Sequence, residues 1–180
     1  MEIYIPELVN PNQTASGAAF ATFTTKKSVD PTPIPVLAAG RLTRGRKLYM
    51  SARGEYSTTG TPTLTWGFWF GNRALTITGD IALSSVITTP SGAAAFPWIM
   101  EWQGVCTGEG TSGTLLGQGH LIQGTSLTAF SLFPIPITQA LRTVTIDTTI
   151  ERAFGVSATW GTSSGSNSIT VNELRVMLLN

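Results

Sequence analysis

The sequence contains few charged residues. Only 12% of its 180 residues are Asp, Glu, Lys or Arg, about half of the ~25% found in a typical soluble protein. The formal net charge is +1, so the chain has no general electrostatic attraction to nucleic acid or to an anionic membrane surface. Low charge combined with 19 Gly suits a protein built from strands and tight turns, or one whose surface is partly covered by partners.

Cysteine and long apolar runs are scarce as well. Cys106 is the one cysteine, so we expect no intrachain disulfide and no cysteine-based metal cluster. Its alternate neighbours Trp98 and Trp102 indicate a buried structural residue. The longest apolar run, 93–100, contains Pro97 and is far shorter than the ~20 residues that span a bilayer. Because the first ten residues lack the features of a signal peptide, we expect synthesis in a cytoplasm and no membrane segment.

Helical periodicity is also missing. No apolar pattern with a period of 3.6 residues persists for three turns, whereas apolar and polar residues alternate in many short segments. Eight to ten such segments, separated by turns, predict an all-β protein, an antiparallel β-sandwich of the jelly-roll type, at residues 38–180. Residues 1–37 differ by their prolines. They predict an extended N-terminal arm ending in a Pro-rich strap at 31–35, or else a meandering first strand of the domain.

The segment 47–71 is expected to form the centre of the sandwich. It is interpreted as two strands, 47–57 and 63–71, joined as a hairpin by a turn-rich loop. On the second strand Trp66 and Phe68 share the face that is predicted to be buried, while Trp69 lies on the opposite face. That face must therefore be covered by a second sheet, by the arm or by another chain.

Three further features of the strand pattern are specific enough to test. Gly79 and Asp80 predict a tight turn between short strands at 73–78 and 81–88. The segment 97–106 has apolar residues on both faces and predicts a central strand covered on both sides. After a last hairpin that begins at 154–160, the apolar positions change phase in the final strand, which predicts a β-bulge near Asn172 and Glu173.

No motif of catalytic, cofactor-binding or metal-ligating residues is present. His120 is the one histidine, and no spacing typical of a catalytic triad or a metal site accompanies it. Asp147 and Glu151 would lie about 13 Å apart along a strand, beyond the ~5–9.5 Å of paired glycosidase carboxylates. The glycine-rich loop 107–113 has neither the GK[ST] ending nor the helix of a phosphate-binding loop, so it predicts a hairpin loop. We expect no enzymatic activity and no cofactor.

One cluster of basic residues lies at 41–47, which we call the basic turn. It holds Arg41, Arg44, Arg46 and Lys47. Its functional interpretation is a contact for an acidic partner or a phosphate; the alternative is a solvated turn that leads into the first long strand. No aromatic residues are interleaved with these charges, which argues against nucleic-acid binding.

Several segments together resemble a known group of proteins. They are TPTLTWGFWFG at 61–71, a strand that begins with Pro97-Trp98, GTSGT at 110–114, DTT at 147–149, ATW at 158–160 and ITVNELRVMLLN at 169–180. In this order they resemble the jelly-roll structural proteins of tailed bacteriophages, of the head decoration (cement) or head-fibre type. The resemblance covers residues 38–180 and is a pattern of strands and turns.

This resemblance implies a trimeric protein on a capsid surface without catalytic residues. We therefore expect a virion structural protein, a homotrimer that binds the major capsid protein. Strands with apolar residues on both faces need a further cover, so Trp69 is placed at the subunit interface. Docking is assigned to the arm or to the basic turn.

Two alternatives to this hypothesis come from other functional classes. The first is a receptor- or carbohydrate-binding module of a phage fibre or adhesin, in which exposed tryptophans stack on sugar rings; the candidates are Trp66, Trp69, Trp98, Trp102 and Trp160. The second is an enzyme whose carboxylates converge from different strands.

Overall fold

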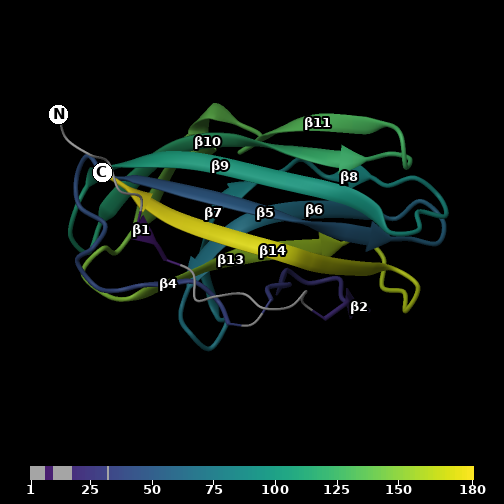
Figure 1. Ribbon diagram of the computed structural model, residues 1–180, viewed down its shortest axis with the longest axis horizontal. Helices are drawn as coiled ribbons and strands as arrows, with labels where there is room; N and C mark the ends of the chain where they lie inside the picture. Colours follow the sequence, from purple (N-terminus) through teal and green to yellow (C-terminus); the bar gives the residue numbers. More distant parts are fainter. Residues whose placement is uncertain (1–6, 10–17, 32) are drawn as a thin grey trace.

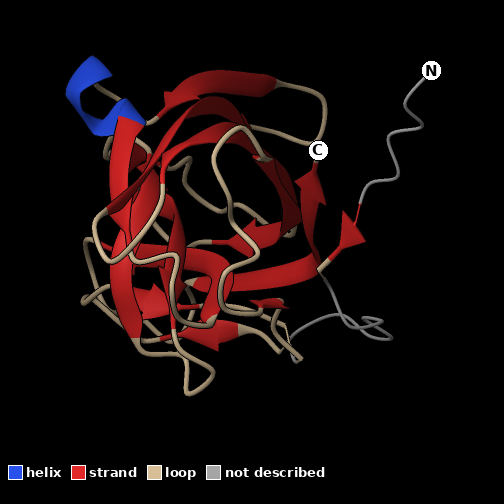
Figure 2. Cartoon of the chain, turned by 90° about the vertical axis from the view of Figure 1, so that its left-hand side faces the viewer, coloured by secondary structure: helices blue, strands red, loops and turns tan. Residues whose placement is uncertain are grey.

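The computed structural model describes residues 7–9, 18–31 and 33–180. These form two antiparallel β-sheets packed face to face (Figures 1 and 2). The expected all-β sandwich is thus confirmed. The helical structure in the described part is one 3₁₀ turn, η1 (Gln139–Arg142). Within the described ranges no helix has the length and apolarity needed to cross a membrane.

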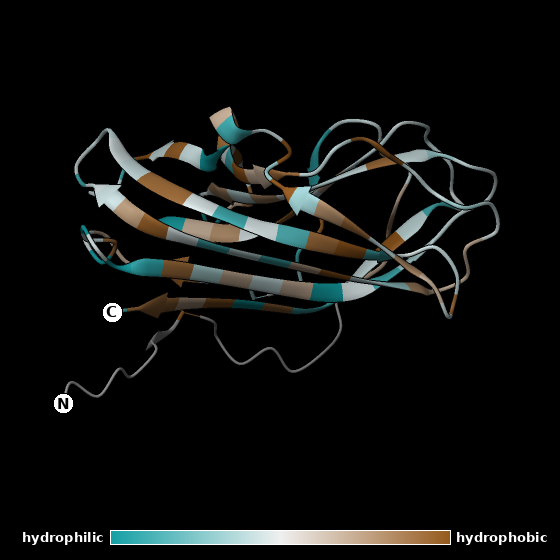
Figure 3. Cartoon of the chain, turned by 90° about the horizontal axis from the view of Figure 1, so that it is seen from above, coloured by the Kyte–Doolittle hydropathy of each residue, from teal (hydrophilic) through white to brown (hydrophobic). Residues whose placement is uncertain are grey.

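Sheet A is the larger of the two sheets. Its main path follows the order β1 (Glu7–Leu8), β14 (Ser168–Leu179), β5 (Lys47–Ser57), β9 (Phe96–Gly108), β10 (Gly113–Gly124) and β11 (Phe130–Ile135). Two short strands extend it, β2 (Phe20–Ala21) beside β14 and β12 (Thr143–Ile146) beside β10. Figure 3 shows long strands whose colours alternate between brown and teal or white, as expected when one face is buried and the other is exposed.

Sheet B covers the inner face of sheet A. Its order is β3 (Lys27–Ser28), β13 (Arg152–Trp160), β6 (Thr63–Gly71) and β7 (Ile77–Leu83), with β4 (Val36–Leu37) beside β13 and β8 (Ile87–Thr88) beside β6.

The two predicted hairpins are instead connections between the sheets. β5 lies in sheet A and β6 in sheet B, and β13 and β14 are divided in the same way. The turn-rich connections 58–62 and 161–167 are long enough to cross the ~10 Å between packed sheets, so each pair of strands buries its apolar faces against one another. The jelly-roll topology is not confirmed: β9, β10 and β11 pair consecutively within one sheet, as do β6 and β7.

Tryptophans fill the space between the sheets. The rings of Trp66 and Trp98 lie with their centroids 4.4 Å apart, and the Trp66 indole N–H donates to the Gln123 side-chain oxygen at 2.9 Å. Trp102 lies against Gly104, where a Cβ would come within 2.2 Å of the indole ring. The predicted burial of Trp66 and of Cys106 is confirmed, since each is at most 1% exposed.

The β-bulge predicted in the last strand is confirmed. Val171 is paired with Gly54 and Glu173 with Arg53, so Asn172 is the extra residue. Through this bulge, the side chains of Val171 and Leu174 both reach the core.

The predicted turn at Gly79 and Asp80 is wrong. Both residues lie inside β7, which stays paired with β6 across two irregularities in register. Trp69 pairs with Asp80 and Phe70 with Gly79. The strand therefore absorbs extra residues as bulges, which a glycine permits, instead of reversing direction.

The described parts of the N-terminal arm cover the edges of both sheets. β1 and β2 pair with β14, whereas β3 and β4 pair with β13. This arrangement covers unpaired edge groups that would otherwise be open to another chain. The strap prolines Pro31 and Pro35 are buried. The parts of the arm prediction that fall on residues 1–6, 10–17 and 32 lie outside the described residues.

Candidate binding surfaces

Asp30 is a fully buried carboxylate that ties the N-terminal segment to the outer face of sheet B. It accepts hydrogen bonds from the Ser28 hydroxyl at 2.5 Å, the Val156 backbone N–H at 2.5 Å and the Trp69 indole N–H at 2.9 Å. Gly155 leaves room for the carboxylate, because a Cβ there would lie 2.3 Å from an Asp30 oxygen. Burial raises the pKa of Asp30 to about 7, although the three hydrogen bonds act in the opposite direction.

This contact corrects the prediction for Trp69. The side chain lies on the outer face of sheet B, as expected, but it is 0% exposed in the single chain. Its indole N–H is bonded both to Asp30 and to the Val156 carbonyl. Trp69 is therefore covered by the chain's own N-terminal segment, and its side chain is not available to a neighbouring subunit.

The tryptophan platform expected of a carbohydrate-binding module is absent. All five tryptophans are at most 1% exposed, because they fill the core or, for Trp69, lie under the N-terminal segment. Sugar rings cannot stack on side chains that present no surface. If the protein binds a saccharide, other residues must form the site.

The basic turn lies at the surface and is attached to the end of β9. Arg41, Arg44 and Lys47 are exposed, and Arg46 is half-buried. The Arg44 backbone N–H donates to the Glu109 carboxylate at 2.6 Å, and the Arg46 guanidinium donates to the Arg41 carbonyl at 3.1 Å. The turn is thus a structured, positively charged surface that an acidic partner could contact.

The residues considered for catalysis do not converge. The His120 imidazole lies 3.9 Å from the Glu101 carboxylate, and both side chains are 40% exposed. Burial raises the pKa of the Cys106 thiol, which disfavours the reactive thiolate. In the part of the chain that the structure describes, no three His, Cys, Asp or Glu side chains could jointly hold a metal ion.

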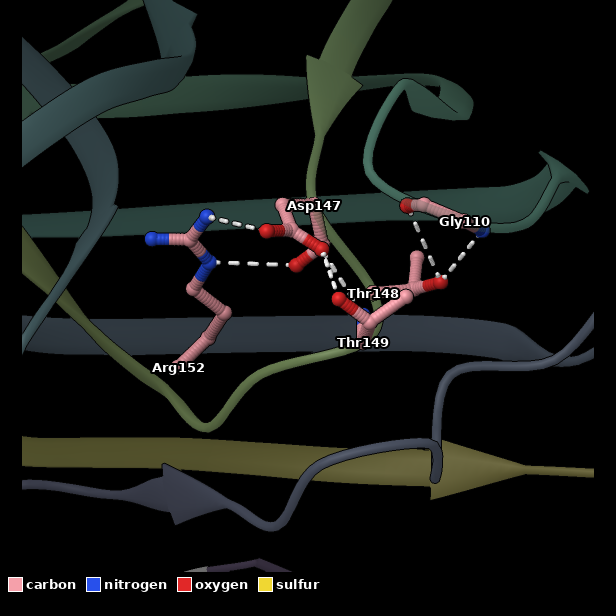
Figure 4. Close-up of polar contacts among 5 residues, drawn as sticks. All are labelled: Gly110, Asp147, Thr148, Thr149 and Arg152. Carbon is pink, nitrogen blue, oxygen red and sulfur yellow. Dashed lines mark hydrogen bonds and ion pairs between the residues drawn. The ribbon is translucent and has the colours of Figure 1, made fainter.

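Asp147 organises the connection between β12 and β13 (Figure 4). Its carboxylate accepts from the Thr149 backbone N–H at 2.9 Å and hydroxyl at 2.6 Å. Arg152 donates from Nε to the Asp147 carbonyl at 3.1 Å and places Nη2 3.9 Å from the carboxylate. Thr148 is bonded to Gly110, and this contact joins the connection to the β9–β10 turn. Chiefly through the Thr149 hydrogen bonds, the pKa of Asp147 is lowered.

The expected placement of Asp147 and Glu151 on one strand is wrong. They are the first and last residues of the loop between β12 and β13. Glu151 forms a bidentate ion pair with the Arg73 guanidinium, and both N···O distances are 2.6 Å. Each carboxylate is therefore engaged with its own cation.

A cleft of about 470 Å³ opens between β7 of sheet B and β12 of sheet A. Asp147 and Arg152 lie on its wall together with Asp80 of β7. Asp80 Oδ2 is paired with the Lys26 ammonium at 2.5 Å, whereas its buried Oδ1 has no hydrogen-bond partner among the described residues. The remaining lining combines hydroxyl and aliphatic groups: Phe70, Thr78, Gly79, Ile81, Ala82, Leu83, Thr111, Leu141, Thr143, Val144 and Thr145.

A second surface feature is an apolar strip on the outer face of sheet A. Ile99, Ile122 and Leu132 are paired in one row across β9, β10 and β11. Phe130 lies two residues before Leu132 on β11, and Leu127 lies in the turn between β10 and β11. Leu132 is 68% exposed, Phe130 55% and Leu127 72%. Among the described residues nothing covers the outer face of β9 at Ile99, which is 39% exposed, contrary to the prediction for 97–106.

Sequence reasoning missed three of these features. Nothing in the sequence indicates the environments of Asp30 and Asp80, because these environments arise from strands that are distant in the sequence. The apolar strip does leave a mark in the sequence, since residues 110–141 contain no Asp, Glu, Lys or Arg. Edge strands of soluble proteins commonly carry charges that prevent association, so a long uncharged segment that includes an edge strand is a signal for an exposed apolar surface.

Comparison with known proteins gives no further constraint. The sequence matches no protein-family model and no curated protein.

Proposed function

We propose that the chain is a non-enzymatic structural protein of a virion, a capsid decoration (cement) protein that binds major capsid subunits as a homotrimer. The observation that carries the proposal is the apolar strip of Ile99, Ile122, Leu127, Phe130 and Leu132. The sequence resemblance to phage decoration and head-fibre proteins supports the viral assignment, and the β-sandwich is compatible with it.

The strip has the properties of a surface that becomes buried on assembly. Leucine and phenylalanine side chains gain roughly 1.5–3 kcal/mol each when they pass from full exposure to full burial. The strip adjoins β11, which ends sheet A and pairs only with β10 among the described strands. Pro134 in β11 has no backbone N–H, which limits uncontrolled strand addition at this edge. The favoured contact therefore uses side chains on the face of the sheet.

The trimer interface is accordingly moved from Trp69 to the apolar strip. An uncharged patch does not repel the surface of an identical subunit, so it suits contacts within a homo-oligomer, and the resemblance to phage decoration proteins supports three subunits. The basic turn remains the proposed contact with the capsid, since Arg41, Arg44 and Lys47 are exposed and would complement acidic groups on a capsid subunit.

The assembly can be tested with Leu132→Asp, using Leu75→Asp as the matched control. Leu75 is another exposed leucine, at 40%, and it lies in the β6–β7 turn of the other sheet. Light scattering coupled to size-exclusion chromatography should show a trimer for the wild type and for Leu75→Asp, and a monomer for Leu132→Asp. A wild-type monomer at micromolar concentration would refute the trimer.

The viral role needs a separate measurement. Purified protein should co-sediment with undecorated heads of the phage whose genome carries the gene, and charge reversal at Arg41 and Arg44 should weaken this binding. If the protein does not bind heads and is missing from purified particles, the decoration role is wrong.

A further inference from the structure

We propose that the cleft between β7 and β12 binds a neutral saccharide through its hydroxyl groups. This inference goes beyond the proposed structural function and does not depend on it. It uses a different part of the molecule, because the cleft is lined by the facing edges of the two sheets, whereas the apolar strip lies on the outer face of sheet A.

The first argument is an accessible carboxylate acceptor. Asp147 lies on the wall of the cleft, and its side chain is 23% exposed. Its Oδ2 atom lies 3.9 Å from the Arg152 guanidinium, beyond hydrogen-bond distance, so this oxygen can accept from a ligand hydroxyl. The pKa of Asp147 is lowered, which keeps the group ionised.

The second argument is the supply of donors and further acceptors. Thr78, Thr143 and Thr145 bring hydroxyl groups to the cleft, and each can donate and accept. In the described part of the chain, β7 pairs only with β6, and β12 pairs only with β10. The facing edges of β7 and β12 therefore carry backbone N–H and C=O groups without a strand partner. A ligand with many hydroxyls matches this dense, mixed set of groups.

The third argument concerns charge. The two carboxylates of the cleft are each engaged by a cation, Asp80 by Lys26 at 2.5 Å and Asp147 by Arg152 at 3.9 Å. The site thus has no surplus charge for an anion or a metal ion. A neutral ligand that accepts and donates hydrogen bonds is favoured over phosphate or a divalent cation.

The last argument is the shape of the cleft and its apolar surface. Leu83, Leu141 and Val144 contribute aliphatic surface, against which the C–H face of a sugar ring can pack. A volume of about 470 Å³ falls within the roughly 300–1,000 Å³ of small-molecule sites. The Phe70 ring is already occupied, since the Arg152 guanidinium lies 5.5 Å from its centroid, so recognition depends on hydrogen bonds more than on stacking.

Saturation-transfer NMR on the full chain can test this proposal. The probes are glucose, galactose, N-acetylglucosamine, maltose and lactose, with inorganic phosphate and calcium chloride as charged probes. Thr145→Trp should block the cleft from the exposed side of β12, and Asp147→Asn should replace the charged acceptor by a neutral amide of the same shape. Thr88→Trp places the same bulk on an exposed position of β8, outside the cleft, and serves as the control.

The expected result is binding of at least one neutral sugar by the wild type and by Thr88→Trp. Asp147→Asn should weaken this binding by about tenfold or more, the effect of losing a hydrogen bond to a charged group, and Thr145→Trp should abolish it. The proposal is overturned if none of the sugars binds, if a sugar binds Thr145→Trp as well as the wild type, or if phosphate or calcium binds the cleft in preference to every sugar.

Discussion

The buried carboxylate of Asp30 predicts an unusual dependence of stability on pH. Its folded-state pKa is about 7, against 3.8 for an ordinary aspartate. Below pH 4 the group is protonated in both the folded and the unfolded chain. Between pH 4 and 7 the unfolded chain releases the proton while the folded chain retains it. The free energy of unfolding should therefore fall as the pH rises through this range, and level off above pH 7.

The size of the effect follows from the shift in pKa. A difference of about 3 pH units corresponds to about 4 kcal/mol, at 1.36 kcal/mol per unit. Asp147 and Glu151 have lowered pKa values, so they act in the opposite direction, and mainly below pH 4.5. Their contribution is common to the wild type and to any variant at position 30, which makes the difference between the two chains the informative quantity.

Asp30→Asn is the appropriate perturbation. The amide cannot titrate. Its NH₂ group is a donor and replaces an oxygen that accepts hydrogen bonds in the wild type, so it faces another donor. We therefore expect a pH-independent loss of about 1–3 kcal/mol in the free energy of unfolding. Urea unfolding followed by tryptophan fluorescence, at pH values from 4 to 8.5, gives the free energy of unfolding for both proteins. The wild type should lose stability relative to the variant between pH 4 and 7. Parallel pH profiles for the two proteins would refute the assigned role of Asp30.

Three further predictions concern packing. Trp66→Ala should lower the free energy of unfolding by about 3–5 kcal/mol, since it removes a buried ring and its hydrogen bond to Gln123; a melting temperature within two degrees of the wild type would contradict this. Deletion of Asn172 should remove the bulge and leave a regular ladder in which Val171 and Leu174 still face the core, so the variant should keep its soluble expression and its β-rich circular dichroism; a deletion variant that fails to fold would be inconsistent with the register described above. Gly155→Ala should displace the Asp30 carboxylate, because the new Cβ would lie 2.3 Å from it, and should therefore increase protease cleavage near residue 30, whereas an unchanged cleavage pattern would show that the segment is held by other contacts.

The strands were predictable because their signal is local. Alternation along a strand depends on which face is buried, and the bulge at Asn172 follows from a change of phase within one segment. The partner of a strand is not a local property. The pattern in 47–71 shows that Trp66 faces a core, but it is equally compatible with a hairpin partner and with a strand in the opposite sheet.

The candidate sites show the same division. The exposed strip on β11 could have been anticipated from the uncharged segment 110–141. The cleft could not, because Asp80 meets the region of Asp147 only through the packing of the two sheets. Trp69 illustrates a third case: its outward orientation was correctly derived, yet the identity of its cover depended on Asp30, 39 residues earlier in the chain.

The pairing of β5 with β14 has a consequence for synthesis. β5 ends at Ser57, and its partner begins at Ser168. At roughly 5–20 residues per second, a ribosome needs on the order of 5–20 seconds to make the intervening segment. During this time one edge of β5 has no partner, and the apolar faces of β5 and β6 have only part of their final cover. The nascent chain is therefore most exposed to aggregation between the completion of β6 and the emergence of β14.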